Sequence, residues 1–256
     1  MSRRIGWACV AGMGLLLLLQ PFLAPYDPRA VDLAHALERP GAAHPLGTDG
    51  VGRDVMARVA AGAWSSIVIG LVALAISSAV GVVLGIAAGA GSRGADRVLS
   101  ALVDLLLAFP RFLLLLNLAA VFPLGSAAGV GILIGAISWM RTARMVRTEV
   151  LSLRERSFVE AARAAGARGP RLFVHHLGPH VARLVATSAA LRFASVIVAA
   201  STLDFLGMGL PSESPTWGRL ILDGQGYLDT APWVTLSAVA AVGLTAVGLT
   251  LASERR

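Results

Sequence analysis

Long apolar stretches alternate along the chain with short intervals that hold most of its polar and charged residues. Six stretches stand out, over residues 5–23, 64–90, 98–121, 124–140, 184–203 and 231–252. Because a helix rises about 1.5 Å per residue, about 20 apolar residues cross the hydrocarbon core of a bilayer. The pattern predicts an all-α membrane protein with six transmembrane helices, of which the fourth is the shortest.

The first apolar stretch allows two interpretations. Arg3 and Arg4 precede it, which is typical both of a cleaved signal peptide and of an uncleaved first helix. No convincing small-x-small cleavage site follows, and Pro21 and Pro25 flank the place where cleavage would occur. We therefore favour an uncleaved helix that keeps Arg3 and Arg4 in the cytoplasm.

Composition supports the membrane class. Apolar residues make up 56% of the chain and charged residues only 14%, with a mean hydropathy of +0.73; soluble domains are about 25% charged. The net charge is +7, but the basic residues lie between apolar stretches rather than in a stripe beside aromatic residues, which argues against nucleic-acid binding. All 22 basic residues are Arg, so the chain lacks the Lys of a Walker A loop. If ATP drives this protein, the ATPase must be another polypeptide.

The distribution of Arg predicts the orientation in the membrane. The interval 141–183 carries nine of them, namely Arg141, Arg144, Arg147, Arg154, Arg156, Arg163, Arg168, Arg171 and Arg183. If both termini are cytoplasmic, fifteen Arg lie inside and five outside, as the positive-inside rule requires. The chain then divides into a first helix with an external loop, 1–63, a core of five helices, 64–252, and a cytoplasmic tail, 253–256.

Four charged residues lie in or beside the apolar stretches and are functional candidates, because intramembrane charges normally face protein or water: Asp104, Arg111, Arg192 and Asp204. Asp104 and Arg111 are seven residues apart, which places them on nearly one helix face about 10 Å apart. Pro110 should kink the helix beside Arg111. In the alternative interpretation, Asp104 lies near the cytoplasmic end and only pairs with a neighbour such as Arg97.

The segment 157–166 is short, rich in Ala and edged by polar residues. Ser157 and Glu160 have the S-x-x-E spacing of a capping box, and Gly166 is a typical helix stop. The predicted helix of about two to three turns is too short to be stable alone in water and too polar to cross a bilayer. It therefore requires a partner surface, for which we expect a soluble motor protein.

Candidate metal and catalytic groups are few. His44, Asp49 and Asp54 lie in a segment rich in Gly and Thr, where turn chemistry explains them better than a metal does. His176 and His180 are one helical turn apart, but Pro179 lies between them and neighbouring Arg would repel a cation. The single cysteine, Cys9, allows no intrachain disulfide and no cysteine metal site. The sequence also shows no nucleophile–base pair. We therefore expect that the chain is not an enzyme and binds no cofactor of its own.

Several segments together resemble one family. Glu160-Ala161-Ala162, Gly166 and His176-Leu177-Gly178-Pro179 resemble the EAA loop of bacterial ABC importer permeases. The dipeptide/oligopeptide/nickel permease family shows motifs similar to His44-Pro45-Leu46-Gly47-Thr48-Asp49, Gly52-Arg53-Asp54, Phe109-Pro110, Ala143-Arg144-Met145-Val146-Arg147, Phe205-Leu206-Gly207-Met208-Gly209 and Trp217-Gly218. Their order matches the second permease subunit of that family, and the ordered set covers nearly the whole chain.

The resemblance implies a type I importer permease fold in the bacterial inner membrane. It implies a homologous permease as heterodimer partner, two cytoplasmic ATPases that bind ATP and Mg²⁺, and an extracytoplasmic substrate-binding protein. In such families the segment corresponding to 157–166, within the EAA loop 141–183, is the coupling helix that docks on the ATPase. The residues expected to couple the ATPase are Ser157, Glu160, Ala161, Ala162, Ala165, Gly166 and Pro179, with the three Ala forming a flat contact face. Asp104, Arg111, Arg192 and Asp204 become translocation-path candidates.

Two departures from the family pattern stand out. Gly178 replaces the usual Leu before Pro179, and residues 247–253 lack the usual Asn and Gly-Asp.

Peptides are the family's commonest cargo, and nickel or a metal chelate is the alternative. A secondary transporter would need an ion site, for which Asp104 and Asp204 are the candidates, and such folds usually show repeated halves.

Overall fold

The computed structural model describes residues 6–8, 11–12, 14–15, 25–122, 124–167 and 169–253. The predicted first span, 5–23, falls mostly outside these residues, although 6–8, 11–12 and 14–15 are helical. Arg3, Arg4 and Arg168 lie outside the described residues too, as does most of the tail 253–256. The position of the two termini relative to the membrane therefore remains a prediction.

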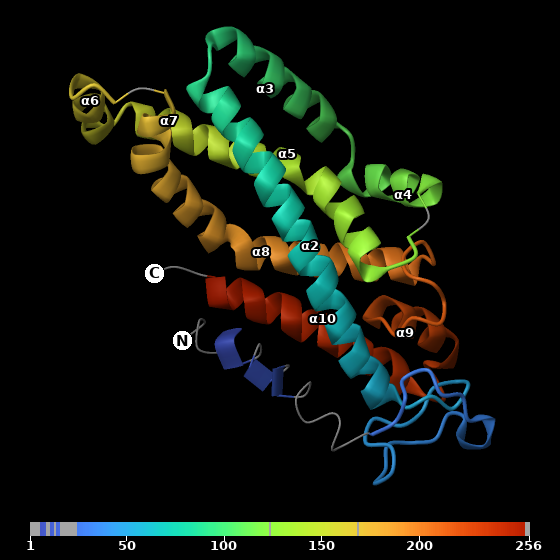
Figure 1. Ribbon diagram of the computed structural model, residues 1–256. Coiled ribbons are helices and arrows are strands. Elements are labelled where there is room, and N and C mark those ends of the chain that lie inside the picture. The colour runs from blue at the N-terminus through green and yellow to red at the C-terminus, as the bar shows by residue number, and fades with distance from the viewer. Residues whose placement is uncertain are drawn as a thin grey trace. The chain divides into compact units, whose positions relative to one another are not determined.

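Helices make up nearly all the regular structure of the described part, which confirms the all-α class (Figure 1). The long elements are α2 (Val55–Ala90), α3 (Arg93–Ala108), α4 (Arg111–Val121), α5 (Ala127–Arg154), α8 (Gly178–Phe205) and α10 (Pro232–Ser253). The short ones are α6 (Ser157–Ala164), α7 (Gly169–Leu172), α9 (Trp217–Gly224), a π-helical turn η2 (Phe173–Leu177) and the 3₁₀ turns η1 (Leu33–His35) and η3 (Gln225–Tyr227). Within the described residues, an isolated β-bridge joins Thr48 and Asp54.

Three helical segments of the described chain are long and apolar enough to cross a membrane. They are Val55–Ala90, Phe173–Phe205 and Pro232–Ser253. A fourth span is possible if α3 and α4 count as one broken helix, since the pair passes the same test of length and composition. The sequence therefore predicts more spans than these helices establish.

α2 and α5 extend furthest beyond the apolar stretches that predicted them. α2 begins at Val55 rather than at residue 64, because the Asp54 carboxylate accepts the amide hydrogen of Ala57 at 2.6 Å and caps the first turn. The division at 63/64 thus falls inside a helix. α5 continues past residue 140 to Arg154, so the interval 141–183 starts as a helix rather than a loop. In this helical part of the interval Arg141 and Arg144 are exposed, whereas Val146 and Val150 are fully buried.

The third predicted span is broken. α3 and α4 meet at an angle of 84°, at Phe109 and Pro110. A bend at Pro110 is as expected, since proline removes an amide donor and clashes with the preceding turn. The bend also means that Asp104 and Arg111 do not share one straight helix face, which corrects the prediction from their spacing.

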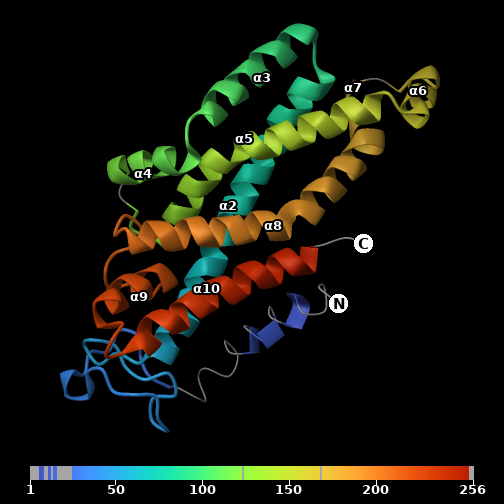
Figure 2. The same ribbon diagram turned by 180° about the vertical axis from the view of Figure 1, so that it is seen from behind.

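The chain divides into two compact units. Unit 1 comprises Met1–Val72, Leu116–Ile134 and Ala190–Arg256, and unit 2 comprises Ala73–Leu115 and Gly135–Ala189. In unit 1, α9 packs against α10 (Figure 2). Trp217 opens α9 and is 2% exposed, and its indole Nε1 donates a hydrogen bond of 2.8 Å to the Val59 carbonyl. The core around this tryptophan includes Val55, Leu220 and Val234.

In unit 2, a row of glycines brings α2 close to α5. A Cβ added at Gly81, Gly85 or Gly89 would lie 2.5 to 2.9 Å from atoms of α5, which real side chains do not tolerate. The atoms concerned belong to Thr142, Ala143, Val146 and Val150. The small residues of the second apolar stretch thus allow close contact between α2 and α5.

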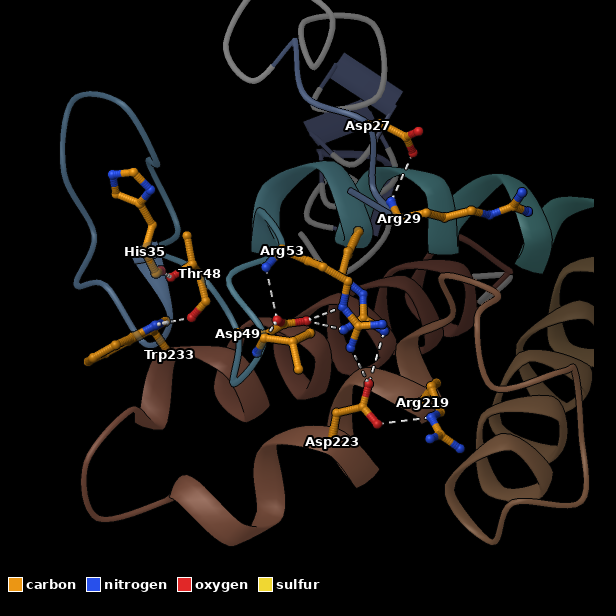
Figure 3. A network of polar contacts seen from close by, with 11 residues as sticks. Asp27, Arg29, His35, Thr48, Asp49, Arg53, Arg219, Asp223 and Trp233 are labelled. Carbon is orange, nitrogen blue, oxygen red and sulfur yellow. Dashed lines mark hydrogen bonds and ion pairs between the residues drawn. The ribbon is translucent and has the colours of Figure 1, made fainter. Parts of the chain in front are cut away.

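A buried network of Arg and Asp fixes the polar loop of unit 1 (Figure 3). Asp49 accepts hydrogen bonds from Arg58 Nη1 and from Arg53 Nε, the latter at 2.7 Å. Asp223 of α9 accepts from Arg53 Nη2 at 3.0 Å and from Arg58 Nη2 at 3.1 Å, and it pairs with Arg219 at 2.9 Å. The side chains of Asp49 and Arg58 are each 1% exposed. Asp49 and Asp223 thus compensate the buried guanidinium of Arg58 and the partly exposed ones of Arg53 and Arg219, and the network ties the loop to α2 and α9.

The network also determines the acidity of Asp49. Burial would raise the pKa of this carboxyl, but the charges of Arg58 and Arg53, together with the amides of Arg53 and Val51, outweigh burial. The pKa of Asp49 therefore lies below its ordinary value. Because the folded pKa is depressed, the stabilisation is complete above about pH 4 and is lost as the pH falls through the lower, folded pKa.

We expect Asp49→Asn to lower the stability of the protein by about 3–5 kcal/mol at pH 7, because it removes one of the two carboxylates that compensate the buried Arg58. The thermal midpoint of the purified protein in detergent, measured between pH 7 and pH 3, provides the test. The difference in thermal midpoint between the wild type and Asp49→Asn should become smaller as the pH approaches 3. Asp27→Asn is the matched control, since Asp27 is exposed and its carboxylate accepts the amide hydrogen of Arg29 rather than pairing with a buried guanidinium. An equal effect of both substitutions would contradict this account.

Candidate functional site

The candidate site is the short helix α6, which follows α5 in unit 2. The chain leaves α5 in a turn where the Arg156 amide donates to the Leu153 carbonyl at 3.1 Å. Arg156 is the N-cap, and no side chain caps the helix. Ser157 is therefore already the first helical residue, so the predicted capping box between Ser157 and Glu160 does not form. The amides of Val159 and Glu160 bond instead to the Arg156 carbonyl, at 2.9 and 3.2 Å.

The end of α6 has the predicted glycine stop. Gly166 has φ +88°, a conformation that residues with a Cβ rarely adopt. Its amide donates to the Arg163 carbonyl at 3.0 Å, and the Ala167 amide donates to the Ala162 carbonyl at 2.9 Å. These two bonds form a Schellman motif, which satisfies the last carbonyls of the helix and turns the chain away.

One face of α6 is anchored to its own chain. Val159 is fully buried, at 0% exposed, and Ala162 is 8% exposed. Val159 packs in a small apolar core with residues of α5, η2 and α8, of which Val150, Leu153 and Leu177 are each at most 2% exposed. Of the three Ala expected to form a flat contact face, Ala161 and Ala165 are exposed, whereas Ala162 is buried.

The opposite face of α6 is exposed. It comprises Ser157, Phe158, Glu160, Ala161, Arg163, Ala164 and Ala165. The Phe158 side chain stacks on His180 of α8, with ring centroids 5.3 Å apart and an angle of 29° between the planes. The exposed face thus combines a positioned aromatic ring with small residues and two opposite charges, a surface suited to a protein groove.

The connection from α6 to α8 runs through the π-helical turn η2. The Gly178 amide donates to the Phe173 carbonyl, five residues back, and Pro179 follows in the first turn of α8. Because Phe173–Phe205 is one continuous helical segment, Pro179 lies inside it, directly after the π-helical turn. A Cβ at residue 178 would lie 3.1 Å from the Phe173 oxygen, so Gly178, the departure from the family pattern, fits this turn without crowding.

The histidines beside this turn do not converge. His175 lies near the Arg171 carbonyl, with Nδ1 at 3.3 Å from the oxygen, whereas His180 stacks on Phe158. The described residues contain no group of three or more His, Cys, Asp or Glu side chains that would hold a metal ion.

Two translocation-path candidates lie in unit 2. Asp104 forms an ion pair with Arg144 of α5, not with Arg97, and the two side chains are 65% and 51% exposed. A pair so exposed contributes little stability. Arg111, at the start of α4, is half-buried and donates from Nη2 to Ser138 Oγ of α5 at 3.0 Å.

The other two candidates lie in unit 1. Arg192 is half-buried within α8. Asp204 is 5% exposed at the end of the same helix, where its Oδ1 accepts the Leu210 amide hydrogen at 2.8 Å. A Cβ at Gly209 would lie 1.9 Å from that oxygen, so the following loop folds tightly over the carboxylate. Asp204 thus holds a loop in place.

Sequence patterns missed several contributors to the site. The role of Val159 was hidden because a single apolar residue gives no periodic signal, although Val159 and Ala162 have the i, i+3 spacing of one helix face. The ion pair of Arg147 with Asp96, at 2.9 Å for Nη2, and the bond from Arg154 to the Gly89 carbonyl, at 2.7 Å, join segments that are far apart in the chain.

Comparison with known proteins agrees with this architecture. Residues 81–256 match the family described as "Binding-protein-dependent transport system inner membrane component". The dipeptide transport system permease protein DppC of Alkalihalophilus pseudofirmus is 31% identical, over 98% of this chain and 82% of its own length. The oligopeptide transport system permease protein OppC of Mycobacterium tuberculosis is 36% identical, over 90% of this chain and 81% of its own length.

A third relative is the probable D,D-dipeptide transport system permease protein DdpC of Escherichia coli, which is 35% identical over 93% of this chain and 80% of its own length. The match to the family covers more than half of the chain, and these similarities cover most of it. This chain belongs to the binding-protein-dependent transport system inner membrane components and is a permease component of an ABC importer.

Proposed function

We propose that this chain is one of two related permease subunits of an ATP-driven importer of di- or oligopeptides. Its partners are a homologous permease, two cytoplasmic ATPases and an extracytoplasmic substrate-binding protein. The names of its relatives, which transport dipeptides and oligopeptides, support the cargo. The chain has no Lys for a Walker A loop, which supports an ATPase on separate polypeptides.

In the proposed topology six helices cross the membrane, and both termini and the interval 141–183 face the cytoplasm. The positive-inside rule supports this orientation, since fifteen of the 22 Arg then lie inside. In it α6 faces the compartment that holds the ATPases, and the Asp49 network lies on the opposite side. Alternating access results when closure of the ATPases pushes on α6 and the spans move in response.

The observation that carries the proposal is the division of α6 into an anchored and an exposed face. A coupling helix must bind a partner on one side and transmit force on the other. Val159 attaches α6 to α5 and α8, while Phe158, Ala161 and Ala165 remain exposed. We assign the ATPase contact to this exposed face, together with Ser157, Glu160 and Arg163. Gly166 and Pro179 shape the exit from the helix.

We expect Gly166→Val to uncouple ATP hydrolysis from uptake. A β-branched residue at φ +88° costs about 1–3 kcal/mol of strain and displaces the exit turn of α6. Uptake by the reconstituted complex should fall by about tenfold or more while ATP hydrolysis continues. A small displacement of the surface that transmits the force lowers the rate of the step that depends on it. Peptide uptake and phosphate release measured in the same proteoliposomes provide the test.

Gly94→Val is the matched control for this experiment. Gly94 lies in the first turn of α3, has no positive φ, and its nearest potential Cβ contact is Ser92 Oγ at 3.9 Å. The control should import at the wild-type rate. Wild-type uptake by the Gly166 variant would contradict the proposed role of α6.

We expect Val159→Ala to loosen α6 from the rest of unit 2. The change removes buried apolar area worth about 1–3 kcal/mol, so amide exchange in residues 157–166 should rise by roughly tenfold or more. Hydrogen exchange of the purified permease followed by mass spectrometry measures it. Val174→Ala is the control, because Val174 is 60% exposed in the adjacent turn. Equal exchange in the two variants would show that Val159 does not anchor the helix.

A further inference from the structure

The bend between α3 and α4 encloses a cavity of about 210 Å³ in unit 2. Two of its lining residues are basic, namely Arg111 at the start of α4 and Arg141 on α5. The other described lining residues are apolar and include Leu107, Phe109 and Met140, and none of them is Asp or Glu. The cavity therefore places two guanidinium groups beside an apolar wall without a carboxylate to compensate them.

The hydrogen bonds of the two Arg leave most of their donors available. Each guanidinium has five N–H groups. The described contacts use one from Arg111, the 3.0 Å bond to Ser138 Oγ, and give Arg141 no ion pair. Asp104, the acidic residue of α3 nearest in sequence to the bend, is paired with Arg144. The positive end of the α4 dipole lies at Arg111 as well, which adds to the attraction for an anion.

We propose that Arg111 and Arg141 form a subsite for the terminal carboxylate of a transported peptide. This inference rests on the proposed function. Arginine matches the planar geometry of a carboxylate with paired hydrogen bonds, and the apolar wall accommodates the side chain of the residue that carries it. The cavity is smaller than the roughly 300–1,000 Å³ of sites that enclose a whole drug-sized ligand, so it fits one end of a peptide.

A second cavity provides room for the rest of the peptide. It measures about 620 Å³ and shares Leu107 and Arg141 with the first cavity. Its lining continues along α5 through Met145 and Thr148 to Glu149. The two cavities thus adjoin at Leu107 and Arg141, and Arg111 lines only the smaller one. The phosphate of an anionic lipid is, like a peptide carboxylate, an anion that Arg binds. The experiment below distinguishes a bound lipid from a bound peptide.

The test uses the complete importer, with both permeases, the ATPases and the binding protein, in vesicles of phosphatidylcholine alone. The probe is a labelled pool of tripeptides that end in leucine or phenylalanine, compared with the same pool amidated at the C-terminus. Arg111→Gln and Arg141→Gln should each lower uptake of the free acids by about tenfold or more. The loss should appear mainly as a raised KM, while ATP hydrolysis stimulated by the binding protein persists.

Three controls make the outcome specific. Arg111→Lys and Arg141→Lys keep the charge and should retain part of the uptake. Arg183→Gln removes an exposed Arg of α8 outside both cavities and should import normally. The amidated pool should show no further loss in the Gln variants, because the group that they would bind is already absent.

Each contrary result has one meaning. Equal losses for free acids and amides would overturn the subsite and indicate a structural role for the two Arg. A loss that appears only after phosphatidylglycerol is added would overturn it in favour of a lipid site. Normal uptake by the variants would overturn the subsite while leaving the proposed function intact. If the wild-type complex imports no peptide, the proposed function fails and the subsite fails with it.

Discussion

The close packing of α2 on α5 is the constraint on which unit 2 depends. It is possible because Gly81, Gly85 and Gly89 present no side chains where α5 approaches. With the backbones this close, Val146 and Val150 of α5 become fully buried, and they form the surface on which Val159 of α6 rests. In lipid such packing is favourable because van der Waals contact between helices replaces the hydrophobic effect that drives association in water. The position of the candidate coupling helix therefore follows from glycines far away in the sequence.

Charge serves different purposes in the two units. In unit 1, Asp49, Arg53, Arg58 and Asp223 are largely buried and compensate one another, so they fix a loop to its helices. Such a network is costly to break, since removing one partner leaves an uncompensated buried charge. In unit 2, the pair of Asp104 and Arg144 is exposed and contributes little stability. Arg111 and Arg141 have no carboxylate partner in the cavity that they line, which is the arrangement expected where a ligand supplies the negative charge.

The two ends of α6 show how far the local sequence determines where a helix begins and ends. The glycine stop forms as predicted, because only a residue without a Cβ adopts φ +88° without strain. The predicted capping box does not form, because its geometry requires Ser157 to be the N-cap, and the turn after α5 places Arg156 there. The end of α6 depends on the backbone conformation of Gly166 itself, whereas its first residue depends on the direction in which the chain leaves α5.

The sequence by itself determined the helical membrane class, the existence of α6, the bend at Pro110 and the family. These follow from local properties, namely apolar length, backbone freedom at glycine and proline, and an ordered set of motifs. Only the tertiary structure decided that α5 runs on to Arg154, that Ala162 is buried, that Asp104 pairs with Arg144, and that Arg111 and Arg141 share a cavity. Each of these depends on which segments meet across long stretches of chain, and no periodic pattern within one segment encodes its partner.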